Sequence, residues 1–115
     1  MITEKEKKNR DELFRLMQEN PELPVVPMVD SEIVADNDYN YWMGSWGNSR
    51  VEEYVLGNEH LHFREDDDWD DIERTLTDGF LSYDDFEIMP DEEAKSEYAA
   101  LPWIKAIIVN IDLPE

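Results

Sequence analysis

The chain has 115 residues, of which 30 are acidic and only 10 are Lys or Arg, so the formal net charge is −20 at pH 7. A net charge of about 2–8 is enough to keep a small domain soluble. The surplus opposes direct binding to nucleic acid or to an anionic membrane, because every phosphate would be repelled. The sequence has no cysteine, which excludes disulfides and thiolate chemistry. With 41% hydrophobic residues, we expect one folded domain over residues 1–115.

Two features bear on cellular location. The first six residues are followed by charged residues instead of the apolar run of a secretory signal. The longest apolar stretch, Ala106–Val109, is far shorter than the roughly 20 residues needed to cross a bilayer. We expect a cytoplasmic protein that does not contact a membrane.

The first expected element is a helix over residues 3–20, because Thr3 and Glu6 have the spacing of a capping box. Prolines then end it, and a short strand follows over Val25–Val29. Pro27 has no N–H, which predicts that this strand lies at a sheet edge. The apolar residues on or beside the helix face predicted to be buried are Leu13, Phe14, Met17 and Leu16.

The middle of the chain predicts an antiparallel meander. Residues 39–46 are rich in aromatic side chains and alternate as a strand does. The turn signal Gly47-Asn48-Ser49 follows, and Val51–Leu56 is expected to return as the second strand of a hairpin. A further turn at Gly57-Asn58 predicts a third strand over His60–Phe63.

Two helices and one strand are expected in the remainder. Residues 66–77 place Trp69, Ile72 and Leu76 on one helical face, and residues 82–85 have the spacing of a capped turn. Pro90 begins a second helix that runs to about residue 101. The apolar run within residues 105–113 predicts a central strand that is buried on both faces.

Together these elements predict an α+β fold. We expect a single domain with a mainly antiparallel sheet of about four or five strands and two or three helices packed on one face.

The densest charge lies in residues 65–97, which hold 15 acidic residues against Arg74 and Lys95. On one helix, the eight acids of residues 65–78 would span about 21 Å, or about 2.6 Å per charge. Duplex DNA carries one charge per about 1.7 Å, so this density is compatible with phosphate mimicry. The simpler interpretation is a solvated helix face whose acids complement the helix dipole. The candidate partner-binding residues are Glu65, Asp66, Asp67, Asp68, Asp70, Asp71, Glu73, Asp84, Asp85, Asp91, Glu92 and Glu93.

The two histidines are a weaker candidate site. His60 and His62 would point to one face of a strand, and a nearby glutamate would complete a minimal metal site with hydrolytic activity. The simpler interpretation is two half-exposed histidines on a polar face, with Leu61 and Phe63 facing the core. An EF-hand that starts at Asp66 would lack both its turn glycine and its last glutamate. We expect neither a metal nor a cofactor.

No catalytic motif is evident. The sequence contains no Gly-x-Ser-x-Gly, Gly-x-x-x-x-Gly-Lys or Gly-x-Gly-x-x-Gly pattern, and nothing singles out one pair among the 30 acids. We expect a non-enzymatic protein. Six aromatic rings form a set of which we expect most in the core, with one face of the strand over residues 39–46 left open as an exposed surface: Tyr39, Tyr41, Trp42, Trp46, Trp69 and Trp103.

Four short stretches carry a resemblance. Arg10–Met17, Pro24–Val29, Tyr41–Gly44 and Leu101–Trp103 are similar to stretches of short acidic proteins from prophages and mobile elements of Gram-positive bacteria. Small acidic proteins of mobile elements include inhibitors of host defence nucleases, among them anti-CRISPR proteins, several of which mimic nucleic acid. The resemblance implies an acidic inhibitor and assigns no site residue.

The leading hypothesis is an acidic binding protein that occupies the basic groove of a nucleic-acid-handling partner, such as a CRISPR nuclease. The alternative is an interaction module that uses the aromatic hairpin, with the acidity serving only solubility. The sequence leaves the partner and the oligomeric state open.

Overall fold

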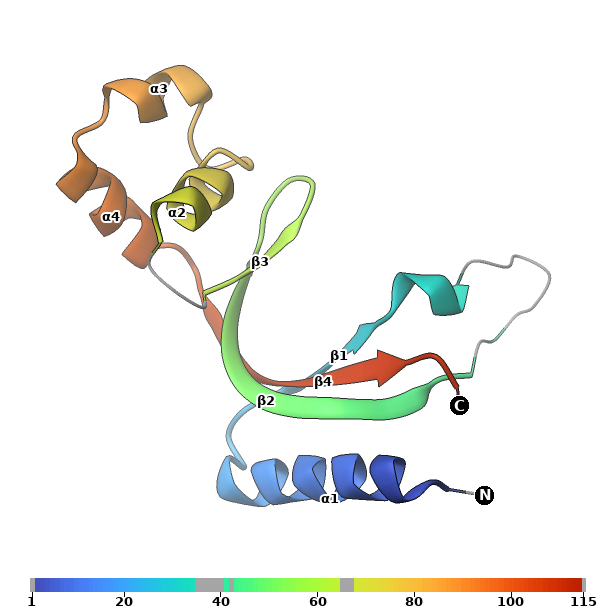
Figure 1. Ribbon diagram of the computed structural model, residues 1–115. Helices are drawn as coiled ribbons and strands as arrows, with labels where there is room; N and C mark the ends of the chain where they lie inside the picture. Colours follow the sequence, from blue (N-terminus) through green and yellow to red (C-terminus); the bar gives the residue numbers. More distant parts are fainter. Residues whose placement is uncertain (1, 35–40, 42, 65–67, 115) are drawn as a thin grey trace. The chain divides into compact units, whose positions relative to one another are not determined.

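A computed structural model describes residues 2–34, 41, 43–64 and 68–114 (Figure 1). The chain divides into two compact units: unit 1 is Met1–Val51 with Ala106–Glu115, and unit 2 is Glu52–Lys105. In chain order the elements are α1 (Glu4–Glu19), β1 (Val25–Val29), the 3₁₀ helix η1 (Ser31–Val34), β2 (Ser45–Leu56), β3 (Leu61–Phe63), α2 (Trp69–Leu76), α3 (Tyr83–Ile88), α4 (Asp91–Ala99) and β4 (Ile104–Asp112). The strands form one sheet in the order β1-β4-β2-β3, which confirms the α+β fold.

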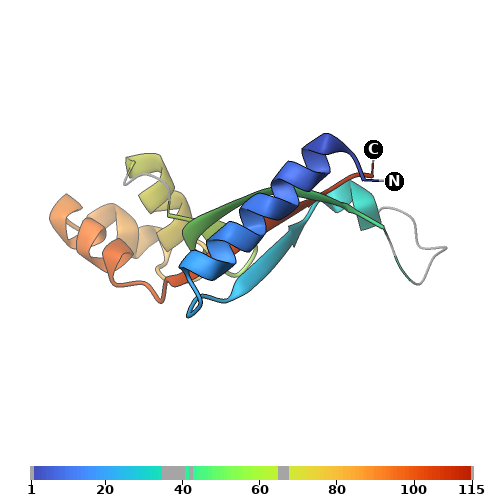
Figure 2. The ribbon, with the colours of Figure 1, turned by 90° about the horizontal axis from the view of Figure 1, so that it is seen from below.

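Helix α1 begins where its capping signal predicts. The Thr3 hydroxyl accepts a hydrogen bond from the Glu6 N–H at 3.0 Å. Figures 1 and 2 show α1 lying along the strands of unit 1. On its inner face, Leu13 and Leu16 pack with Ile107 and Val109 of β4, so this pair anchors the helix to the sheet.

The buried face of α1 is narrower than the sequence predicts. Phe14 is 52% exposed and Met17 is 41% exposed, so placing them in the core was wrong. Each lies one position, or about 100° of helix, beyond Leu13 or Leu16. A face centred on those two leucines therefore turns Phe14 and Met17 toward solvent.

Strand β4 holds the centre of the sheet, as predicted. Its residues Ala106–Val109 are at most 1% exposed, and β1 pairs with it in parallel from Val25↔Ile107 to Val29↔Ile111. Strand β1 lies at the sheet edge, which confirms the prediction from Pro27. Because this pair is parallel while β2 and β3 are antiparallel, the sheet is mixed.

The predicted turn at residues 47–49 is wrong, because these residues lie inside the continuous strand β2. Gly47 serves close approach instead: a Cβ there would lie 2.7 Å from the carbonyl oxygen of Asn110 on β4. Asn48 accepts a side-chain hydrogen bond from the same Asn110. Of the strand predicted over residues 39–46, positions 39, 40 and 42 lie outside the described residues, and positions 41, 43 and 44 are not in a strand.

The hairpin between β2 and β3 follows the prediction. The Gly57 N–H donates to the His60 carbonyl at 2.8 Å, and the strands pair from Tyr54↔Phe63 to Leu56↔Leu61.

Unit 2 is built around short helices. Its buried core consists of Ile72, Leu76, Phe86, Ala94 and Tyr98, with Trp69 and Trp103 packed against it. The predicted apolar face of α2 is thus confirmed, and α2 packs against α4.

The helix starts in unit 2 differ in detail from the prediction. The Ser82 hydroxyl accepts from the Asp85 N–H at 3.1 Å, and the short helix α3 follows this cap. Pro90 is the N-cap of α4 instead of its first residue.

Across the described residues, no helix combines the length and apolar character that a membrane span requires.

Candidate functional site

Nine of the twelve candidate acidic residues lie on or beside the three helices of unit 2. Asp68 is the N-cap of α2, and its backbone is extended. The others are Asp70, Asp71 and Glu73 on α2, Asp84 and Asp85 on α3, and Asp91, Glu92 and Glu93 on α4. Glu65, Asp66 and Asp67 lie outside the described residues.

The acidic helix predicted for residues 66–77 is present but shorter than expected. Helix α2 has eight residues, a length of about 12 Å, and carries only three acids. The extended backbone of Asp68 precludes an earlier helical turn at that residue, so the helix begins at Trp69. Eight of the nine described candidates therefore lie on three short helices, and Asp68 lies immediately before the first of them.

Most of these carboxylates are exposed, and among the described residues only Asp71 and Glu92 of this set pair with a Lys or Arg. Of the nine, only Asp71 and Glu73 are half-buried. The three helices, all of whose residues are described, contain just two basic residues. Arg74 already lies 3.3 Å from Asp71, and Lys95 lies 3.9 Å from Glu92. Unit 2 has 18 acidic and 4 basic residues, a net charge of −14, so the surplus stays on its surface.

Helix electrostatics explain part of this pattern. Seven of the nine acids occupy the first turns of α2, α3 and α4. A carboxylate there interacts favourably with the helix dipole by about 0.3–1 kcal/mol. The dipole term favours helix starts at these positions, but it leaves the net charge unchanged and does not account for Asp68 or Glu73.

A groove between α3 and α4 interrupts the acidic surface. It has a volume of about 310 Å³ and is lined by Leu81, Asp85, Ile88, Met89, Pro90 and Glu93. Ile88 is 84% exposed. The sequence carries a signal for this exposure that helical-face analysis missed. The residues three and four positions from Ile88 on either side are all acidic, namely Asp84, Asp85, Asp91 and Glu92.

The histidine pair is not the half-exposed pair of the simpler sequence interpretation. His62 is 8% exposed, and its Nε2 lies 2.7 Å from Asp78 Oδ2. Asp78 also accepts the backbone N–H groups of Glu59 and His60, each at 3.0 Å. The contact thus ties the β2–β3 turn to a position two residues beyond the end of α2.

The pKa of Asp78 reflects this environment. The hydrogen bond with His62 lowers it to about 2, burial opposes the shift, and the two backbone N–H groups add to the lowering. A second hollow of about 370 Å³ beside the pair is lined by residues 60–63, Asp71, Arg74 and Thr75. In the described part of the chain, no three His, Asp or Glu side chains gather in a way that would hold a metal ion.

The aromatic residues divide between core and surface. Trp69 and Trp103 pack against the core of unit 2. Tyr41 is 89% exposed and Trp46 is 39% exposed, so these two rings belong to the surface. Tyr39 and Trp42 lie outside the described residues.

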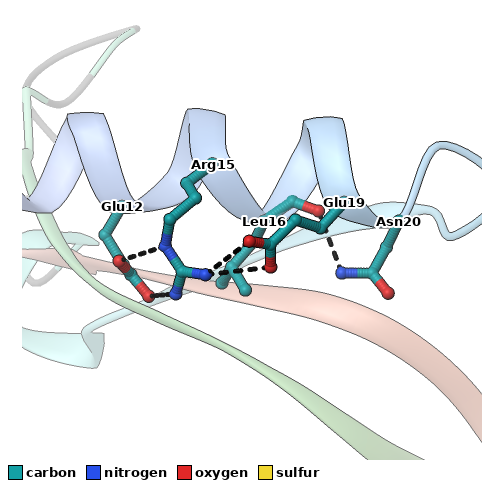
Figure 3. Close-up of polar contacts among 5 residues, drawn as sticks. All are labelled: Glu12, Arg15, Leu16, Glu19 and Asn20. Carbon is teal, nitrogen blue, oxygen red and sulfur yellow. Dashed lines mark hydrogen bonds and ion pairs between the residues drawn. The ribbon is translucent and has the colours of Figure 1, made fainter.

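On α1, unlike on the helices of unit 2, one arginine contacts two acidic side chains of its own helix. Arg15 lies between Glu12 and Glu19, as Figure 3 shows, and its Nη1 donates to Glu19 at 2.8 Å. The hydrogen bond with Arg15 lowers the pKa of Glu12, and the two glutamates raise the pKa of Arg15. Both glutamates are therefore paired within their own helix, and the single cation offsets one of their two charges.

Comparison with known proteins gives no match to a family model, and no significant match to a curated protein or to a solved structure.

Proposed function

We propose that this is a non-enzymatic, cytoplasmic protein whose acidic unit 2 binds a basic surface of a nucleic-acid-handling protein. By occupying that surface it would inhibit the partner, and a CRISPR nuclease is the type of partner that the sequence resemblance suggests. One observation carries the proposal: the acids of α2, α3 and α4 are mostly exposed, and both cations on these helices are already paired.

The charge of this surface sets the expected binding behaviour. A net charge of −14 in one unit attracts a basic groove over a distance and repels nucleic acid. Association is then fast and weakens as salt screens the charges. Duplex DNA should compete with the protein, because both would occupy the same basic groove.

A matched pair of charge variants tests the proposal. The first carries Asp84→Asn, Asp85→Asn, Asp91→Asn and Glu92→Gln in unit 2, where all four side chains are exposed. The second removes the same charge from exposed sites in unit 1, through Glu4→Gln, Asp11→Asn, Glu22→Gln and Glu32→Gln. Affinity is measured by calorimetry against purified nucleases, with and without duplex DNA.

We expect the unit 2 variant to bind at least about tenfold more weakly and the unit 1 variant to stay close to the parent. The parent should also reduce nuclease activity, and added DNA should displace it. Equal weakening by the two variants would show non-specific charge attraction and contradict the proposal. Binding that neither variant changes would also contradict it.

A second candidate function rests on the exposed apolar residues of unit 1. Tyr41 and Met43 are 89% and 81% exposed, and Trp46 lies nearby in sequence at 39%. An interaction module that uses them would bind its partner at low and high salt alike. Trp46→Ala should then weaken binding where the unit 2 charge variant does not.

A further inference from the structure

The groove between α3 and α4 combines two surface chemistries. Leu81, Ile88, Met89 and Pro90 supply apolar lining, whereas Asp85 and Glu93 supply one carboxylate from each helix. Neither carboxylate forms an ion pair with any residue that the structure describes. The groove thus has an apolar lining, and the two carboxylates beside it have no cationic partner among the described residues.

The walls of the groove are fixed by the core of unit 2. Phe86 anchors α3, with its ring centroid 5.5 Å from that of Trp69. Leu81 and Met89 pack partly against the same core. The side chain of Ile88 contributes nothing comparable, since it is 84% exposed. The fold therefore holds a large aliphatic side chain in water within an acidic surface.

Size and charge identify the kind of occupant. A volume of about 310 Å³ lies at the lower end of the range of about 300–1,000 Å³ for small-molecule sites, and suits one large side chain with its neighbours. Between Arg74 and Lys95 the sequence has seven acids and no Lys or Arg. An occupant must therefore bring cationic groups on both sides of an apolar one.

We propose that this groove binds a cationic segment of the partner protein in which one large apolar side chain is flanked by Lys or Arg. The apolar side chain packs on Ile88, and the flanking cations pair with Asp85 and Glu93. The inference rests on the proposed function, because it names the segment that the acidic surface recognises. It adds a contact that salt does not screen.

Two synthetic peptides test the groove directly. Both carry the same Lys and Arg residues, and they differ only in a central Leu that is replaced by Gln in the second. Their affinities for the full chain are measured by calorimetry at low and at physiological salt. We expect the Leu peptide to bind about 10- to 100-fold more tightly, because burial of one Leu side chain provides this difference.

Variants locate the contact. Ile88→Asn should abolish the preference for the Leu peptide without unfolding the chain, since the side chain is exposed. Leu56→Asn is the matched control, because Leu56 is also exposed (64%) and lies outside the groove. Asp85→Asn with Glu93→Gln should weaken both peptides and retain the preference. Amide NMR spectra confirm that each variant is folded.

The outcomes separate this inference from the proposed function. If both peptides bind equally, the groove proposal is overturned while charge-driven binding stands. The same conclusion follows if Ile88→Asn retains the preference. If neither peptide binds at low salt, the acidic surface does not attract cationic segments, and both proposals are overturned.

Discussion

The two units of this chain carry acidic residues in contrasting ways. Unit 1 has 12 acidic and 6 basic residues, and the side chain of Arg15 contacts two glutamates of its own helix. Unit 2 has 18 acidic and 4 basic residues, most of its helix-borne acids are exposed, and both cations on its helices are already paired.

The contrast separates charges that stabilise a helix, as on α1, from charges in unit 2 that folding does not require. In unit 1 the ion pairs lie at helical spacings of three and four residues, where they support α1. In unit 2 the repulsion among like charges opposes folding, and the apolar core must offset it. A surface that works against its own fold points to a role outside the fold, which is why the proposals centre on unit 2.

The largest expected effect would show whether the two units depend on separate cores. Tyr98→Ala removes a side chain that is 1% exposed in unit 2, and should lower the free energy of unfolding by about 3–5 kcal/mol. Leu13→Ala, 4% exposed in unit 1, should lower it by about 2–5 kcal/mol. Urea denaturation measures both, and hydrogen exchange should show lost protection mainly in α4 for the first and in α1 for the second. Identical patterns would show that the units unfold as one.

One glycine in each unit allows the backbone requirements of the two units to be compared by substitution with alanine. Gly47→Ala in unit 1 would place a Cβ 2.7 Å from the Asn110 carbonyl oxygen, and should cost about 1–3 kcal/mol as β2 and β4 shift. Gly79→Ala in unit 2 adds conformational strain, since φ is +99° there, and also brings a Cβ to 2.5 Å from Asn58 Cγ, so it should cost at least about 1 kcal/mol. Thermal denaturation measures both variants. A neutral Gly47→Ala would show that the strands separate freely.

Acid should weaken unit 2 through Asp78. Its pKa falls from 3.8 to about 2 in the folded chain, mainly through the hydrogen bond with His62, so folding favours the ionised carboxylate. This contribution is complete above about pH 4 and is lost as the pH falls toward 2. Asp78→Asn should destabilise the chain at neutral pH and lose this part of the acid dependence. Thermal midpoints of parent and variant across the range measure it, and parallel curves would contradict it.

The smallest expected effect belongs to the best-paired cation. Arg15→Gln removes the contacts with Glu12 and Glu19, but the three side chains are 41–54% exposed and water replaces much of the interaction. We expect a thermal midpoint close to that of the parent, with α1 intact by circular dichroism. A large loss would show that pairing on α1 stabilises unit 1 more than an exposed pair normally does.

The spacing of apolar residues in the sequence correctly predicted which strand is buried and which face of α2 lies in the core. The apolar run of β4 gave its central place, and the spacing of Ile72 and Leu76 gave the buried face of α2. Thr3 and Ser82 gave correct helix caps. In each case the signal depends on residues close together in sequence.

Features set by distant residues were not predicted. The local sequence Gly47-Asn48-Ser49 predicts a turn. In the structure, Gly47 and Asn48 instead lie in a strand and contact Asn110 of the neighbouring strand β4. The partnership of His62 with Asp78 likewise joins residues 16 positions apart. The acidic residues were identified from their local density in the sequence, which placed the acids of residues 65–78 on one helix, whereas three short helices carry most of the described candidates.

The parallel pairing of β1 with β4 bears on the order of folding. Val25 pairs with Ile107, so this contact must close a loop of about 80 residues before it forms. The β2–β3 hairpin and the short helices need only local contacts, which form faster. Strand β1 should therefore be the last to join the sheet. Until it does, the backbone N–H and C=O groups of β4 that β1 pairs with stay open to other chains. Pro27 opposes further strand pairing only once β1 has become the edge of the completed sheet.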